Sequence, residues 1–129
     1  MGKNMMVLAP EPKDFTVTFD QFRDASSYWQ PHGHFSAGPI TEDGDSDATI
    51  EVTRPGEPTC LIIHFRTAVM IYIDGTEEQA ADVAAWAINT FPKTGPGEVW
   101  MVDQGYSGHS VLHRGTSAND ILQNWQEHR

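Results

Sequence analysis

The stretch that decides the fold covers residues 59–91 and reads "TCLIIHFRTAVMIYIDGTEEQAADVAAWAINTF". Its two most apolar runs, 59–65 and 68–74, are short and rich in β-branched residues, which favours two strands. Only "RT" separates them, so we expect a central hairpin. Because this dipeptide is not typical of two-residue hairpin turns, the register of the pair stays open.

The second half of the same stretch has the signals of a helix over residues 76–91. Thr76 and Gln79 form a capping box, and Pro92 ends the helical pattern. Apolar residues recur between them at helical spacing: Ala80, Val83, Ala84, Ala87, Ile88 and Phe91. The small alanines predict a helix that lies close against the sheet, with Trp86 on its flank.

Before this stretch, the sequence predicts three shorter strands. Residues 14–22, "DFTVTFDQF", alternate strictly between apolar and polar, as a half-buried strand does. Residues 34–40 and 48–54 predict two more strands, with an acidic loop between them. Residues 1–12 contain two prolines and are expected to be an extended or disordered lead-in.

After it, residues 98–104 and 109–114 predict a second hairpin around "GYSG". Thr116 or Ser117 is expected to cap a short terminal helix. The order of elements predicts an α+β fold: an antiparallel sheet of about five to seven strands with two helices packed on one face. A chain of 129 residues fits a single domain, residues 1–129.

The charge of the chain excludes some classes of partner. Asp and Glu number 18 against 8 Lys and Arg, which gives a formal net charge of −10. Nucleic acids and anionic membranes are repelled by such a field, whereas a basic protein is attracted. The alternative is that the acidity only keeps the protein soluble.

The single cysteine excludes an internal disulfide and favours the cytoplasm. Cys60 lies in an apolar run and is expected to be a small buried hydrophobe. The N-terminal apolar run "MMVLA" is too short for the core of a signal peptide. No motif of a hydrolase, metalloprotease, nucleotide-binding loop or redox dithiol occurs, so we expect no enzyme and no cofactor.

Four histidines form the candidate metal site. His32 and His34 are spaced as same-face neighbours on a strand, and His109 and His113 lie on a second predicted strand. Three of these four imidazoles can hold zinc if the strands are neighbours. The H-x-H spacing is that of cupins, but the next carboxylate, Glu42, follows too late for that pattern. The alternative is that His32 and His34 flank a glycine turn in solvent.

The acidic loop is a candidate calcium site. Asp43, Asp45 and Asp47 stand at the first, third and fifth positions of an EF-hand-like loop. The required glycine and terminal glutamate are replaced by Ala48 and Arg54. This excludes a calcium cage and leaves a solvated acidic turn or a weak surface site.

The last part of the chain resembles a known group of proteins. The segments that carry the resemblance are "RPGEPTCLIIHFRTAVMIYIDGTEEQAADVAAWAINTFP" and "GEVWMVDQGYSGHSVLHRGTSANDILQNW". They are similar to small orphan proteins of actinobacteria and their bacteriophages and, more loosely, to immunity proteins that neutralise toxins. The resemblance implies a binding protein acting in a bacterial cytoplasm, that of the host if a phage encodes it, and assigns no site residues.

The sequence thus predicts a small acidic protein that binds, and in an immunity-like role inhibits, a basic partner. The expected surface combines acidic residues with aromatic anchors: Glu42, Asp43, Asp45, Asp47, Glu51, Tyr28, Trp29 and Tyr106. The acidic residues around the long helix, Asp74, Glu77, Glu78 and Asp82, extend it. A metal-dependent enzyme using His32, His34, His109 and His113 is one alternative, and a structural assembly component is another. The oligomeric state stays open.

Overall fold

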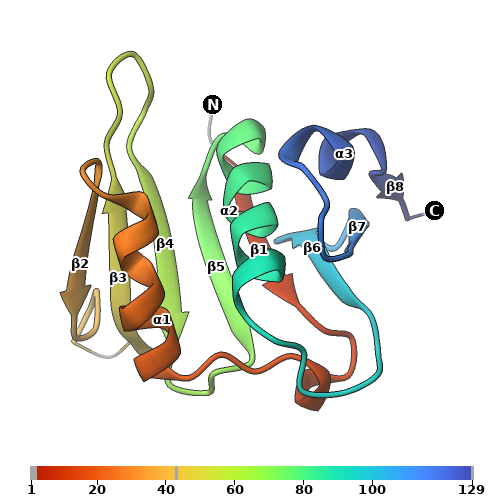
Figure 1. Cartoon of the computed structure of the whole chain (residues 1–129), viewed down its shortest axis with the longest axis horizontal. Coiled ribbons are helices and arrows are strands. Elements are labelled where there is room, and N and C mark those ends of the chain that lie inside the picture. Colours follow the sequence, from red (N-terminus) through yellow and green to blue (C-terminus); the bar gives the residue numbers. More distant parts are fainter. Residues whose placement is uncertain (1–2, 43, 129) are drawn as a thin grey trace.

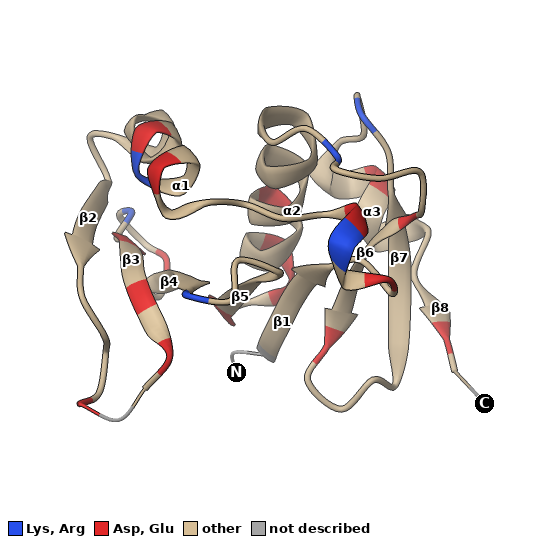
Figure 2. Ribbon diagram, turned by 90° about the horizontal axis from the view of Figure 1, so that it is seen from below, with Lys and Arg blue, Asp and Glu red and all other residues tan. Residues whose placement is uncertain are grey.

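The computed structural model describes residues 3–42 and 44–128. They form one antiparallel sheet of eight strands, with three α-helices on one of its faces (Figures 1 and 2). This confirms the predicted α+β class, with more strands and helices than expected. No helix in these two ranges is long and apolar enough to cross a bilayer.

The elements follow one another in a simple order. The strands are β1 (Lys3–Leu8), β2 (Gly33–Ala37), β3 (Ser46–Val52), β4 (Cys60–Phe65), β5 (Met70–Gly75), β6 (Val99–Asp103), β7 (Gly108–Leu112) and β8 (Gln126–Glu127). The helices are α1 (Phe19–Ala25), α2 (Glu77–Thr90) and α3 (Ala118–Gln123), with single 3-10 turns η1 (Pro12–Asp14) and η2 (Ser26–Trp29). Across the sheet the strand order is β2-β3-β4-β5-β1-β6-β7-β8.

The central hairpin and the long helix form as predicted. In the hairpin, β4 pairs with β5 and Ile63 lies opposite Tyr72. The α2 capping box is complete, because the Gln79 N–H donates to Thr76 Oγ1 at 3.1 Å and the Thr76 N–H donates to Gln79 Oε1 at 2.8 Å. Ser117 caps α3 in the same way.

The prediction of a lead-in over residues 1–12 is wrong. Residues 3–8 form β1, which lies in the middle of the sheet between β5 and β6. Met5 and Val7 face the helices, and Met6 is buried on the other face. A strand covered on both sides has no polar alternation, so a short apolar run was its only signal.

The prediction of a strand over residues 14–22 is also wrong. The segment is extended as far as Thr18, and the Val17 N–H donates to the Ala68 carbonyl at 2.8 Å. Helix α1 begins at Phe19. A second capping box, Thr18 with Gln21, starts this helix. Before Thr18, Phe15 and Val17 have the spacing of a strand. After it, Phe19 and Phe22 have the spacing of a helix, so the apparent alternation across the whole segment is misleading.

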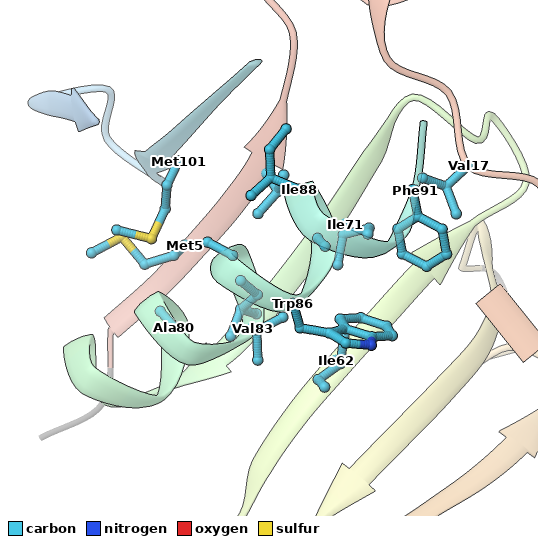
Figure 3. Close-up of a cluster of buried hydrophobic side chains, with 14 of the residues drawn as sticks. Met5, Val17, Ile62, Ile71, Ala80, Val83, Trp86, Ile88, Phe91 and Met101 are labelled. Carbon is cyan, nitrogen blue, oxygen red and sulfur yellow. The ribbon is translucent and has the colours of Figure 1, made fainter. Parts of the chain in front are cut away.

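The core lies between the sheet and α2 (Figure 3). Ala80, Val83 and Ile88 point from α2 toward the sheet and its buried side chains. Trp86 leaves α2 on the side of α1 and lies edge-on to Phe22, with ring centroids 6.4 Å apart. The prediction that Trp86 lies on the flank of the helix is therefore confirmed, and its ring is buried.

Candidate binding groove

A groove of about 310 Å³ lies on the helical side, between η2, α2 and the beginning of α3. We call it the aromatic groove. Its lining residues are Tyr28, Trp29, Arg54, Asp82, Ala85, Trp86, Asn89, Thr90 and Ala118. The volume is at the lower limit of small-ligand pockets, which suits one side chain of a partner.

Three aromatic rings form one wall of the groove. Tyr28 is 66% exposed and stacks on Trp86, with centroids 6.3 Å apart and ring planes at 30°. Trp29 lies edge-on to both rings, 5.1 Å from Tyr28 and 5.5 Å from Trp86. Trp29 is only 4% exposed, so its prediction as an exposed anchor is wrong. Neighbouring residues on a tight turn point in different directions, and here only Tyr28 faces outward.

The indole N–H groups of Trp29 and Trp86 are buried and have no hydrogen-bond acceptor among the described residues. A buried donor without a partner costs roughly 1–3 kcal/mol. Such groups are uncommon in folded proteins, and both of these lie in side chains that line the groove.

Opposite charges meet beside the Trp29 ring in the groove. Arg54 comes from the loop after β3, and its Nη1 lies 4.0 Å from Asp82 Oδ2 on α2. The Arg54 guanidinium carbon lies 5.4 Å from the centre of the Trp29 ring. Burial raises the pKa of the Asp82 carboxyl; Arg54 opposes this shift and Glu57 adds to it. Burial of this carboxyl group therefore outweighs the stabilising effect of Arg54 on its charged form.

A narrow cavity of about 10 Å³ beside the groove is lined in part by Cys60. Burial raises the pKa of the Cys60 thiol to about 12, with Asp74 adding to the shift. The thiol is therefore protonated at neutral pH. This confirms the expectation that Cys60 is a buried hydrophobe.

The predicted acidic surface is only partly assembled. Glu42, Asp45 and Glu51 are exposed, and Asp43 lies outside the described residues. The loop before β3 and the groove lie at opposite ends of this strand, about 20 Å apart by strand rise. Figure 2 shows acidic residues on α1, α2 and several strands, with few basic residues among them.

Asp47 points into the protein, where it meets His64, and is not part of this surface. Asp47 Oδ1 lies 2.6 Å from His64 Nδ1, and the Val17 carbonyl oxygen lies 2.5 Å from Nε2. The two ring nitrogens are therefore both engaged by oxygen atoms, and the ring is held from both sides. His64 is 1% exposed and belongs to the core.

A β-bulge explains why Asp47 turns inward. The register between β3 and β4 shifts between Ser46 and Ala48, so Asp47 is the extra residue. A bulge re-aims the side chain of the inserted residue. The sequence predicts Asp47 as part of an exposed acidic loop, and nothing in the sequence marks the bulge.

The four histidines of the predicted metal site are not brought together. His34 lies on β2 and His109 on β7, and five strands separate β2 from β7, which is roughly 30 Å. His32 is in the turn before β2, and His113 directly follows β7. Among the described residues, no group of three or more His, Cys, Asp or Glu side chains is arranged to hold a metal.

A pair of histidines instead ties the C-terminal strand to the sheet. His109 Nδ1 lies 2.7 Å from His128 Nε2, and His128 Nδ1 donates to the Tyr106 carbonyl at 2.7 Å. Trp100 stacks on the His109 ring, with centroids 3.9 Å apart. Burial lowers the pKa of His109, and the neighbouring His128 lowers it further.

Ser107, two residues before His109, does not bond to it, because its hydroxyl donates to the Asp103 carboxylate. Burial tends to raise the pKa of Asp103, but hydrogen bonds from Ser107 and Gly108 outweigh it, so the pKa is lowered. This carboxylate therefore holds the β6–β7 turn together and does not activate the serine.

Tyr106, the third predicted anchor, is exposed at this β6–β7 turn and lines a different hollow of about 340 Å³. That hollow includes Leu8, Met70 and Trp100, which lie on the sheet face without helices. Tyr28 and Tyr106 thus belong to different faces of the molecule.

Comparison of the chain with models of known protein families, with curated proteins and with solved structures found no match. Its function is therefore inferred from the chemistry of the aromatic groove.

Proposed function

We propose that the protein binds a basic protein partner in the cytoplasm, and that the aromatic groove is the centre of the contact. One observation carries this proposal: the exposed Tyr28 ring rests on the buried Trp86 ring, next to Arg54 and Asp82. Tyrosine, tryptophan and arginine are the residues that dominate interface energies, and a supported ring loses little entropy on binding.

The charge of the chain supports a basic partner. With a formal net charge of −10, the protein attracts cationic surfaces over distances of about one Debye length, 8 Å at 0.15 M salt. The exposed carboxylates of Glu42, Asp45 and Glu51, which lie on β3 and in the loop before it, contribute to this attraction. They act on the rate of encounter, whereas the groove acts on the lifetime of the complex.

The resemblance to immunity proteins extends the proposal to inhibition. A small acidic protein that covers the basic surface of another protein blocks whatever that surface binds. Inhibition requires no catalytic group in the inhibitor, only a surface of complementary charge and shape.

The proposal is tested by affinity capture with immobilised protein in a lysate of the organism that carries the gene. The baits are the wild type, a groove variant with Tyr28→Ala and Asp82→Asn, and a control, Glu11→Gln. Glu11 is exposed in the segment before η1, and its replacement removes one negative charge, as Asp82→Asn does.

We expect a basic protein that the wild type and the control retain and the groove variant loses. Its retention should fall as salt rises past about 0.15 M. Retention of the same proteins by all three baits, or no retention at low salt, contradicts the proposal.

A further inference from the structure

Arg54 occupies the aromatic groove in the manner of a bound ligand. Its guanidinium lies 5.4 Å from the centre of the Trp29 ring and 4.0 Å from the Asp82 carboxylate. An aromatic face and a carboxylate are the two partners that a guanidinium prefers in proteins. These contacts of Arg54, made within the same chain, therefore show how the groove can bind a cation.

Arg54 is held weakly. The distance of 4.0 Å to Asp82 is the outer limit of an ion pair, and the two side chains are 34% and 50% exposed. Exposed pairs of this kind contribute about 0–1 kcal/mol. A competing cation therefore displaces Arg54 at little cost, and the displaced side chain returns to water at the surface.

The groove contains binding space that Arg54 does not fill. About 310 Å³ of open volume adjoins Arg54, and the exposed ring of Tyr28 forms its outer wall. Glu78 lies one helical turn before Asp82 on α2, and both are exposed. Burial, with a smaller contribution from Glu57, raises the pKa of Asp82 in spite of Arg54, so Arg54 compensates only part of the cost of burying this carboxylate.

We propose that the groove binds an arginine side chain of the partner, and that Arg54 fills this place until the partner displaces it. This inference rests on the proposed function and specifies the group that is recognised. Arginine is favoured over lysine because a planar, weakly hydrated guanidinium stacks on the Tyr28 or Trp29 ring and still faces Asp82. Arg54 is accordingly a competitor of the partner and not a contact to it.

The test is an NMR titration of the full chain with the peptide acetyl-Gly-Arg-Gly-amide. The peptides with citrulline and with lysine in place of arginine are the controls, because citrulline keeps the planar shape without the charge. The four tryptophans give four indole N–H signals. Trp29 and Trp86 line the groove, whereas Trp100 and Trp125 line other hollows and serve as internal references.

We expect saturable shifts of the Trp29 and Trp86 signals with the arginine peptide and smaller ones with the lysine peptide. The citrulline peptide should shift neither signal. Arg54→Gln should tighten binding of the arginine peptide about threefold or more, and Asp82→Asn should weaken it about threefold or more. Both positions are at least one third exposed, so both variants are expected to fold.

Four results overturn the inference: no saturable shift up to about 20 mM peptide, equal shifts with citrulline, equal affinity for lysine, or weaker binding by Arg54→Gln. Capture of a partner that depends on Tyr28, without a response to the arginine peptide, overturns this inference and leaves the proposed function intact. A specific response to the peptide without captured protein overturns only the proposed function.

Discussion

The carboxylate of Asp82 is expected to favour binding of a cation but to lower the stability of the fold. Its carboxylate is the only acidic group lining the aromatic groove among the described residues, yet burial raises its pKa above the ordinary value of 3.8. The unfolded chain therefore gives up this proton at a lower pH than the folded protein does. As pH rises above 3.8, folding loses stability relative to a chain without this carboxyl group.

Asp82→Asn should accordingly raise the melting temperature at pH 7, by on the order of 1 °C because the group is half exposed. The gain should vanish near pH 3, where the carboxyl is protonated in both states. Thermal unfolding of the two proteins at the two pH values measures it. A lower melting temperature of the variant at pH 7 would show that Arg54 stabilises the carboxylate more than burial destabilises it.

The sequence gives the residue types of the groove but not their roles. Tyr28 and Trp29 are both aromatic candidates by residue type, but only the turn geometry of η2 leaves Tyr28 exposed and buries Trp29. In the sequence, Arg54 is notable only because it stands where a calcium-binding loop requires a glutamate. Its contact with Asp82 joins a loop to a helix that follows two strands later, and no local pattern reports such a contact.

At the scale of elements, predictions from a single clear pattern succeeded. Strands β4 and β5 are short apolar runs and helix α2 follows one helical period, and the structure confirms all three. The segment from Phe15 to Phe22 changes its period at Thr18, and its helical half was missed. Strand β8 has only two residues, too few to show a period, and the contact between His109 and His128 adds to its pairing with β7.

The histidine pair makes the attachment of β8 dependent on pH. The pKa of His109 is lowered from 6.5, so the folded state favours the neutral ring, and the unfolded or detached state binds the proton more readily. As pH falls through 6.5, protonation therefore favours detachment. The groups around this ring are His128, Trp100 and Glu98, of which Glu98 opposes the shift.

We expect faster amide hydrogen exchange at His128, whose N–H donates to the Ser107 carbonyl, when pH is lowered from about 7.5 to 5.5. The protection factor, corrected for the intrinsic rate, should fall severalfold, while amides of β6 stay protected. In His109→Gln the pH dependence should disappear. Constant protection of His128 in the wild type over this range contradicts the assignment.

At the scale of the molecule, β1 joins two groups of strands. Strands β2 to β5 follow one another on one side, and β6 to β8 on the other, and among the described strands only β1 pairs with both groups. Its side chains are buried on both faces: Met5 and Val7 beneath the helices, and Met6 with Ile63 and Val102 on the opposite face. The sheet is therefore continuous only while β1 is in place.

Val7→Asp should destabilise the whole domain by several kcal/mol, about 3 or more, because it places an unpaired carboxylate at a fully buried position. Chemical denaturation should show one weakened transition or none. Asn4→Asp adds the same charge to the same strand at a half-buried position and should cost less than about 1 kcal/mol. Equal effects of the two substitutions would show that β1 contributes little to the sheet.

The place of β1 also sets the order in which the protein is completed on the ribosome. Leu8 is synthesised early, yet it pairs with Met70 on one side and with Trp100 on the other. Until residues 99–103 leave the ribosome, β1 has at most one partner, and its other edge is an unpaired row of backbone groups beside exposed methionines. Contacts so distant in sequence form slowly. A pause in translation before Val99 therefore exposes the growing chain to aggregation, and synonymous codons that slow this region should lower the yield of soluble protein.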